Sequence, residues 1–388
     1  HCGKWTTRHQ IYTVANSDRG KVSDRKLIPI KNTTVLDKKF TTLSQKLKQN
    51  GYTTCHSGKW HLSNDPLEYS FDLNIAGGPQ GAPGSYYFPF GNKKKQIKVE
   101  NGKSKYLTDL IMEKTLLFLE DVNGPFFLNY SPYAVHTPIH PVDSLLYKYE
   151  NKPPHKGQKN PKYATMVDNI DRNIGLMVDK LKKRKLFDNT FIIFTSDNGG
   201  YYGKITMQKP LRAGKGSYYE GGIRVPFFFV WKNKISPGKN TQTYISHLDI
   251  FPTLMHLSGD DSMKNNLDGR SLLPLLAENQ VVEERPFFWH FPIYLQGYDI
   301  KDNENRDSLF RTRPGSLIRK GDWKLHYYFE DHGIELYNLK DDISERNNLA
   351  EIQVDKREEL ADELKAWWEK TDAPIPTTIN PLYAPRLN

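Results

Sequence analysis

The stretch Phe191-Ile-Ile-Phe-Thr-Ser-Asp-Asn-Gly-Gly200 decides the fold class of this chain. Its apolar and β-branched residues predict a buried strand, and Asp197 and Asn198 place oxygen atoms directly after it. Two glycines then allow a sharp turn. Loops at the carboxyl ends of strands in an α/β sheet bind ligands, and carboxylate and amide oxygens suit Ca²⁺ or Mg²⁺. An Asx turn that merely ends a strand is the alternative interpretation.

The segments before this strand predict a parallel sheet. Residues 163–184 carry apolar side chains at helical spacing and end in basic residues, which is typical of an amphipathic helix. Residues 126–130 predict another buried strand, and residues 41–51 predict a helix that ends at a glycine. Strand, helix and strand in this order predict an α/β fold with a mainly parallel central sheet covered by helices.

The pattern changes after about residue 284. Short strands are predicted at 287–291, 316–319, 323–328 and 334–339, and a helix follows at 354–370. Short strands joined by turns favour an antiparallel sheet. We therefore expect an α/β domain over residues 1–284 and a small antiparallel-sheet-plus-helix subdomain over residues 285–388. The long loop between residues 77 and 105 is expected to border a substrate cleft.

Two further segments place cationic side chains near polar loops. In the segment 58–62, Lys59 and His61 are two residues apart, so on an extended chain they face the same side. The glycine-rich segment 211–226 carries Lys215 and leads into an apolar strand. Together with the acidic loop, these segments predict a divalent cation beside a cluster of positive donors. Each segment alone could equally be a solvated surface loop.

These motifs resemble those of the formylglycine-dependent sulfatases, within the alkaline phosphatase superfamily. The matching segments, in the family's order, are GYTTCHSGKWHL, FTSDNGG, LRAGKGSYYEGGIRVP, SHLDIFPTL, LDGRSLLPLL and LIRKGDWKLHYY. The likeness extends from the first residues to about Ala350. It implies an alkaline-phosphatase-like fold and an enzyme that hydrolyses sulfate esters, which we expect to be a bacterial polysaccharide sulfatase.

The resemblance also implies roles for four side chains. Lys59 and Lys215 would bind the sulfuryl oxygens and offset charge in the transition state. His61 would hydrogen-bond the hydrated formylglycine. His136 would protonate the leaving oxygen, a role that suits a group titrating near neutral pH. An ordinary loop histidine before a proline is the alternative for His136.

The nucleophile implied by the resemblance is a formylglycine made from Cys2. Cys2 and Gly3 begin the family's Cys-x-Pro-Ser-x-Arg pattern, but Lys4 and Trp5 stand where Pro and Ser are expected. We expect that a short stretch between Gly3 and Lys4 is absent from this sequence. The alternative is an incidental cysteine, in a sulfatase-like module that binds sulfated glycan without cleaving it.

By the same resemblance, Asp197 and Asn198 ligate Ca²⁺, with Mg²⁺ as a further possibility. The family's paired aspartates, on an N-terminal strand that we expect to be missing here, would complete the metal site. His290, Arg311 and Arg313 are candidates for substrate binding. A packed histidine and solvated surface arginines are the alternatives.

Other polar residues near the motifs are interpreted as structural. We expect Glu220 and Arg224 to brace the glycine-rich loop, and Asp249 to be the N-cap of a helix. Phosphatases, phosphodiesterases and phosphonate hydrolases of the superfamily bind additional metal, for which His247 and Asp249 could serve. The set of Lys59, His61 and Lys215 favours sulfate-ester hydrolysis over these reactions.

Composition sets the remaining expectations. The 388 residues are 37% hydrophobic and 26% charged, which is typical of a globular protein, and no apolar run reaches the ~20 residues of a membrane span. The net charge of +10 suggests a polyanionic partner, and scattered basic residues without a reading motif favour sulfated carbohydrate over nucleic acid. Cys55, expected in the core, is the only other cysteine, so no disulfide framework is predicted. We expect a secreted or periplasmic protein, and the oligomeric state stays open.

Overall fold

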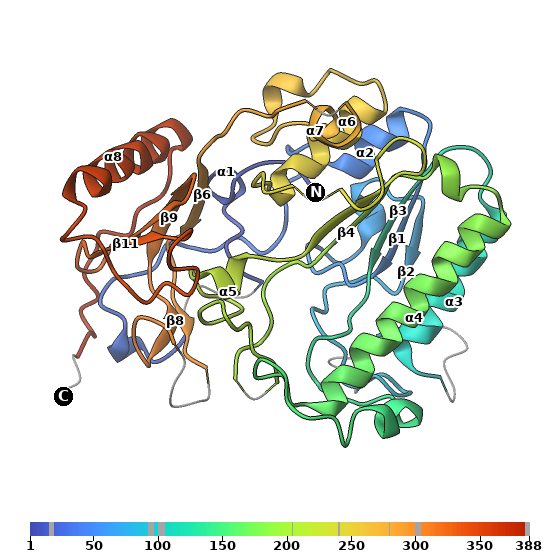
Figure 1. Cartoon of the computed structure of the whole chain (residues 1–388), viewed down its shortest axis with the longest axis horizontal. Coiled ribbons are helices and arrows are strands. Elements are labelled where there is room, and N and C mark those ends of the chain that lie inside the picture. The colour runs from blue at the N-terminus through green and yellow to red at the C-terminus, as the bar shows by residue number, and fades with distance from the viewer. Residues whose placement is uncertain are drawn as a thin grey trace.

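A computed structural model shows a larger α/β part beside a smaller antiparallel sheet (Figure 1). It describes residues 1–14, 19–91, 97–99, 105–203, 205–239, 241–278, 280–298 and 304–384. The lysine run at 93–95, within the loop expected to border the cleft, lies outside these ranges. No helix in the described ranges has both the length and the apolar character needed to cross a bilayer.

The larger part is built on a three-stranded parallel sheet. Its central strand β1 (Thr53–Gly58) pairs in parallel with β2 (Leu73–Ile75) and with β3 (Phe126–Ser131). Parallel strands need crossover connections, and the segments between these strands supply them. The predicted parallel sheet and the strand at 126–130 are confirmed.

Helices cover both faces of this sheet, as predicted. On one face α3 (Leu107–Asp121) and α4 (Pro161–Lys183) lie together, and on the other α2 (Leu43–Gln49) packs with α6 (Ile250–Leu257) (Figure 1). The first pair contributes fully buried side chains such as Leu110 to the largest hydrophobic cluster. Burial of these apolar faces is the main stabilising term of the fold.

The strand after α4 differs from its expectation. We expected it in the parallel sheet, but among the described residues β4 (Ile192–Thr195) pairs only with β5 (Phe227–Val230), antiparallel. Between them lies a loop whose one α-helix, α5 (Glu220–Ile223), is a single turn. The chain therefore returns beside β4 in the opposite direction, since a parallel return needs a full crossover. Phe194 and Phe228 stay 41% and 59% exposed.

The smaller part confirms the predicted antiparallel sheet and its helix. The sheet has the order β11-β10-β9-β6, and α8 packs on β9 and β10. A separate antiparallel pair, β7 and β8, contacts the glycine-rich loop through a hydrogen bond from Thr312 to Gly216 O. The bounds are β6 (Phe287–Phe291), β7 (Leu295–Gln296), β8 (Phe310–Thr312), β9 (Gly315–Lys320), β10 (Trp323–Tyr328), β11 (Ile334–Asn338) and α8 (Val354–Thr371). The domain boundary at residues 284 and 285 stays a prediction.

The N-terminal segment runs across to the smaller part. Trp5 packs edge-on against Phe288 and Trp367, with ring centroids 6.3 and 5.5 Å away. Leu27 forms a backbone bridge with Ile379. The remaining helices are short: α1 (Thr6–His9), α7 (Leu273–Ala277) and 3₁₀ turns at Val22–Asp24, Pro66–Tyr69, Asp143–Lys148, Phe187–Asn189, His247–Asp249 and Lys264–Asn266. Both ends of the described chain thus help to hold the antiparallel sheet in place.

Candidate active site

The position of Lys59, the first cationic side chain of the site, depends on a close approach between the backbones of β1 and β3. Strand β1 ends at Gly58, whose φ of +105° is in the region that favours glycine. A Cβ atom there would lie 2.1 Å from the carbonyl oxygen of Ser131, so only glycine lets the two strands meet this closely. Lys59 N then donates to the same oxygen at 2.6 Å. Its Nζ lies 3.7 Å from Asp197 Oδ2, which joins the end of β1 to the loop after β4.

Glycines also dock the acidic loop onto the glycine-rich loop. A Cβ atom on Gly199 would lie 1.8 Å from the carbonyl oxygen of Gly221, so the two backbones are in direct contact. Lys215 N donates to Gly200 O at 2.9 Å. This contact brings Lys215 and Asp197 together, although 18 positions separate them in the sequence.

Two histidines complete this group of side chains. Burial lowers the pKa of His61 to about 4, and the charges of Lys59 and Lys215 and the neighbouring His136 act in the same direction. Burial likewise lowers the pKa of His136, as do Lys215 and Lys59, while Asp197 opposes them. The structure therefore brings five of the predicted site residues into one electrostatic neighbourhood.

The imidazole of His61 has an unusual environment. Its Nδ1 atom is shielded from solvent and has no hydrogen-bond partner among the described residues. The ring lies against Gly81, where a Cβ atom would come within 2.2 Å of Nδ1. A shielded polar atom without a partner is costly, so the close packing of the ring against Gly81 has an energetic cost.

The proposed metal ligands form only part of a coordination sphere. The Asp197 side chain is 68% exposed, and Asn198 Nδ2 donates to Gly199 O at 2.9 Å. No group of three or more acidic, histidine or cysteine side chains suited to a metal occurs within the described ranges. Ca²⁺ takes six to eight oxygen ligands, so these two residues fit it as a partial set that needs further donors.

The neighbouring pair His247 and Asp249 is structural, as interpreted. His247 Nε2 lies 2.9 Å from Ser196 O, and the Asp249 side chain is fully buried and paired with Arg285. Asp249 occupies the N-cap position of α6, as predicted, but its carboxylate serves the preceding 3₁₀ turn, where it completes a capping box with Ser246. With its oxygens committed to these contacts, Asp249 is not available to a second metal.

Cys2 is packed rather than exposed. Its side chain belongs to an apolar cluster and the residue is only 7% exposed. One member of that cluster is Trp60, which stands between Lys59 and His61 in the chain. Cys2 therefore lies beside the segment that carries two site residues, while Cys55 is fully buried in the main core, as expected.

A buried ion network anchors the glycine-rich loop. Glu220 is fully buried, and its carboxylate lies 3.0 Å from Lys324 Nζ and 3.1 Å from Arg319 Nη1. Lys324 also lies 2.8 Å from Glu345, and Arg224 lies 3.6 Å from Glu220. The contacts agree with the bracing role expected for Glu220 and Arg224, and they tie the loop of Lys215 to the antiparallel sheet.

His290 does not bind substrate in this arrangement, and that prediction is corrected. The residue is 3% exposed, and its ring nitrogens lie 2.6 Å from Ser316 Oγ and 3.1 Å from Pro374 O. Burial lowers its pKa to about 4, so the ring is neutral. Both nitrogens are engaged within the protein, which leaves none for a sugar.

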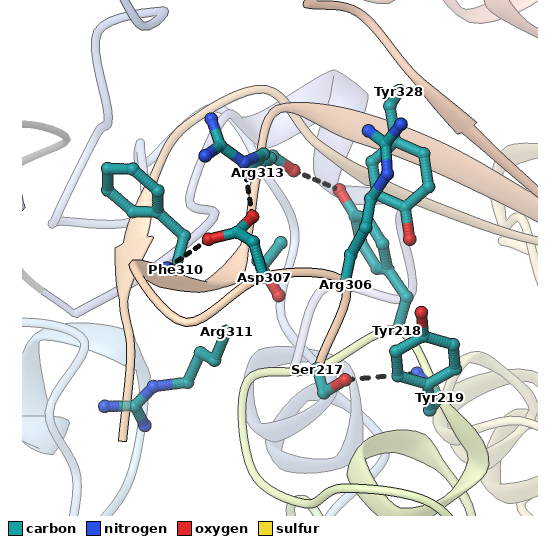
Figure 2. Close-up of a pocket in the computed structure, with 10 residues that line it drawn as sticks. Ser217, Tyr218, Tyr219, Arg306, Asp307, Phe310, Arg311, Arg313 and Tyr328 are labelled. Carbon is teal, nitrogen blue, oxygen red and sulfur yellow. Dashed lines mark hydrogen bonds and ion pairs between the residues drawn. The ribbon is translucent and has the colours of Figure 1, made fainter. Parts of the chain in front are cut away.

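The two candidate arginines of β8 and its exit differ sharply. Arg313 forms ion pairs with Asp307 and Glu330, so its assignment to substrate binding is also corrected. Figure 2 shows Arg313 turned toward Asp307, whereas Arg311 extends away from that pair. The pocket between these residues has a volume of about 10 Å³, which is room for roughly one water molecule and not for a sugar.

Sequence reasoning missed two residues beside Lys215. Arg19 is close enough to lower the pKa of both Lys215 and Arg311, after the larger effect of burial. Tyr201 lies with its ring 5.7 Å from the Arg311 guanidinium. Arg19 has no motif around it, and Tyr201 could have been found only from its position directly after the double glycine.

Comparisons with known proteins agree on one relationship. The family model described as "Sulfatase" matches residues 6–259, and the model described as "N-sulphoglucosamine sulphohydrolase, C-terminal" matches residues 214–373. A protein named "Sulfatase" from Formosa agariphila is 33% identical over 303 residues, covering 70% of this chain and 52% of that protein. Human N-acetylgalactosamine-6-sulfatase is 28% identical over 64% of this chain and 50% of its own length. The chain thus spans about half the length of these curated relatives.

Solved structures give the same result for the fold. The structure described as Ps i-CgsB in complex with k-i-k-neocarrahexaose superposes with a TM-score of 0.73 at 27% identity, covering 97% of this chain and 83% of that one. A Bacteroides thetaiotaomicron structure described as BT33494S-sulf reaches a TM-score of 0.71 at 19% identity, covering 96% and 83% of the two chains. At that lower identity the likeness establishes the fold alone.

Proposed function

Since this chain belongs to the sulfatase family, we propose that it hydrolyses sulfate esters of a carbohydrate, either a polysaccharide or an oligosaccharide derived from it. The observation that carries the proposal is the gathering of two lysines and two histidines in one electrostatic neighbourhood, with Asp197 3.7 Å from Lys59. Such a group presents several hydrogen-bond donors and a net positive charge to a small anion. The whole protein's activity is part of this proposal.

Lys59 and Lys215 would hold the sulfuryl oxygens and stabilise the charge that develops as the ester bond breaks. His136 would donate a proton to the leaving oxygen. Its pKa is lowered by burial and by the two lysines, and a bound sulfate offsets those positive charges, which favours the protonated ring. His61 would hydrogen-bond the nucleophilic residue through its unpartnered nitrogen.

Asp197 and Asn198 would hold Ca²⁺, with Mg²⁺ as a further possibility. When bound, the ion supplies a Lewis acid that polarises the sulfuryl group. Support comes from their oxygen donors at the end of β4, beside the two lysines. Chelation should abolish sulfate release, and Asp197→Ala should lower calcium affinity in titration calorimetry without changing the melting temperature. An Asp197→Ala protein with unchanged calcium affinity and turnover would place the metal elsewhere.

We further propose that Cys2 is the residue converted to formylglycine. The hydrated aldehyde supplies a geminal diol, of which one hydroxyl is the nucleophile and the other expels sulfate. Cys2→Ser should keep sulfate binding and lose turnover, because serine offers a single hydroxyl. Peptide mass spectrometry of active protein would detect the aldehyde. Full turnover by protein whose Cys2 is wholly unmodified would refute this assignment.

A second candidate function is a module that binds sulfated glycan without cleaving it. It is favoured by Lys4 and Trp5, which stand where the family pattern expects Pro and Ser, and by the apolar packing of Cys2. Binding of sulfated glycan without release of sulfate, in protein with unmodified cysteine, would support this candidate over the enzyme.

The deciding experiment compares a sulfated with a phosphorylated chromogenic ester of the same alcohol. We expect faster release from the sulfate ester, because two lysines and no second metal site surround Asp197 in the described residues. Faster release from the phosphate ester would instead support a phosphatase, phosphodiesterase or phosphonate hydrolase. A panel of sulfated algal and animal glycans, assayed for free sulfate, would then identify the substrate class.

Further parts of the proposal concern domains and location. We propose residues 1–284 as the catalytic domain and residues 285–388 as a C-terminal subdomain that supports it. A secreted or periplasmic location suits a large sulfated substrate. Fractionation of the source cells would test the location, and recovery in the cytosolic fraction would contradict it.

A further inference from the structure

Arg311 is held rigidly beside the proposed sulfate site. Its guanidinium lies 4.6 Å from the ring centroid of Tyr298 and 5.7 Å from that of Tyr201. Nε donates to Gln296 O at 2.8 Å, and Nη1 lies 3.4 Å from Lys215 O. The contacts with two carbonyl oxygens and two rings fix the orientation of the side chain before any ligand binds, which lowers the entropic cost of binding.

The charge of Arg311 is not neutralised by any described carboxylate. Two neighbouring arginines show the contrast: Arg313 pairs with Asp307 and Glu330, and Arg306 pairs with Asp331. Arg311 contacts only neutral carbonyl oxygens and rings, and within the described ranges its Nη2 has no hydrogen-bond partner. A guanidinium presents paired donors that match a carboxylate or a sulfate.

The charged side chains near Arg311 are positive, as Arg311 is. Burial lowers the pKa of Arg311, and the charge of Arg19 acts in the same direction. Burial lowers the pKa of Lys215 as well, and both arginines contribute to that shift. Lys215 has the carboxylate of Asp197 in its neighbourhood, whereas no described carboxylate pairs with Arg311, so a bound anion would offset the charge of Arg311.

We propose that Arg311 forms a subsite for a second anionic group on the sugar chain, adjacent to the group held by Lys215. Tyr201 supplies an aromatic ring beside the guanidinium of Arg311. The preferred substrate is thus a saccharide with an anionic substituent, sulfate or carboxylate, close to the scissile sulfate. The inference rests on the proposed sulfate site, but it concerns recognition and not the cleavage step.

Calorimetric titration of the full chain with saccharides of one skeleton tests the subsite. The three probes carry one sulfate ester and, at the neighbouring position, a second sulfate, a carboxylate or a free hydroxyl. At about 0.15 M salt we expect each second anion to improve affinity by about 10- to 100-fold over the hydroxyl. The sulfate and carboxylate probes show which of the two anions the subsite prefers.

Arg311→Met should reduce that preference to within about 2-fold, and Arg311→Lys should restore part of it. Arg306→Met is the matched control, because Arg306 is already paired with Asp331, and it should keep the full preference. Thermal melts of each variant confirm that it is folded. The proposal is overturned if the wild-type chain shows no preference for a second anion, if it binds none of the probes, or if Arg311→Met keeps the preference. Binding with this preference but without sulfate release would leave the subsite intact and refute the catalytic function.

Discussion

Replacing Lys324 by methionine should destabilise the whole protein, because this side chain pairs with two buried carboxylates at once. Its Nζ lies 3.0 Å from Glu220 and 2.8 Å from Glu345, and the side chains of all three residues are at most 1% exposed. Methionine fills a similar volume, so the perturbation removes the charge and leaves the packing nearly unchanged.

The expected magnitude follows from what remains around each carboxylate. Glu220 keeps Arg319 at 3.1 Å, whereas the partners left to Glu345 among the described residues are the backbone N–H of Glu220 and the nearby His326. Removing one partner of a buried ion pair costs about 3–5 kcal/mol, and this partial compensation suggests a loss of about 4 kcal/mol. With an unfolding entropy of about 2.1 cal/mol/K per residue, that loss lowers the melting temperature by about 5 °C.

Scanning calorimetry at pH 7 would measure this shift against a control on the adjoining strand. Lys320 pairs with Glu359 and Glu363 at 3.6 and 2.8 Å but is 43% exposed, so Lys320→Met should cost at most about 1 kcal/mol. Adding Glu345→Gln to Lys324→Met should recover part of the lost stability, because the amide removes an uncompensated charge. If Lys324→Met melts within about 1 °C of Lys320→Met, the buried ion network does not stabilise the fold by the expected amount.

Three further outcomes are expected. Gly58→Ala should lower the free energy of unfolding by more than about 2 kcal/mol, because the new Cβ would lie 2.1 Å from a backbone oxygen. Gly51→Ala is the control: Gly51 has open space around it, so the same change should cost about 1 kcal/mol. Equal effects of the two substitutions in urea titrations would contradict the strand contact. Lys215→Ala should lose about 3 kcal/mol of transition-state stabilisation, read as kcat/KM for a sulfate ester, and a change below 10-fold would remove it from the site. Burial lowers the pKa of His56 and of His290 from 6.5 to about 4, so folding favours their neutral forms. The melting temperature should therefore fall as the pH drops below 6.5. A melting temperature that stays constant down to pH 4 would contradict this.

Local patterns predicted most of the secondary structure and the core of the site. Apolar spacing located α4 within about two residues at each end, and the residues after β1 and β4 were recognised as one neighbourhood. These predictions of structure succeeded because helix periodicity, glycine positions and motifs can be recognised within short stretches of sequence. The proximity of these side chains does not test their function, so the roles of all the site residues, Cys2 and His136 included, stay predictions.

The failures share a physical cause, namely partners that are distant in the sequence. Nothing near His290 in the sequence indicates that Pro374 O will hydrogen-bond to one of its ring nitrogens. In the sequence Arg313 looks as available to a ligand as Arg311, and only the folded chain places Glu330 beside it. Whether a cation is free or neutralised depends on such long-range contacts. The pairing of β4 with β5 was missed for the same reason, since strand order is not encoded within a strand.

The crossing of the N-terminal segment to the antiparallel sheet has a consequence for biosynthesis. During translation the ribosome makes Trp5 and Leu27 long before their partners Phe288, Trp367 and Ile379, which follow about 280–360 residues later in this sequence. At about 5–20 residues per second, the first segment waits roughly 20–70 seconds with its tryptophan unpaired. The nascent chain therefore cannot complete its fold from one end to the other, and a chaperone that shields residues 1–30 during this interval should raise the yield of native protein.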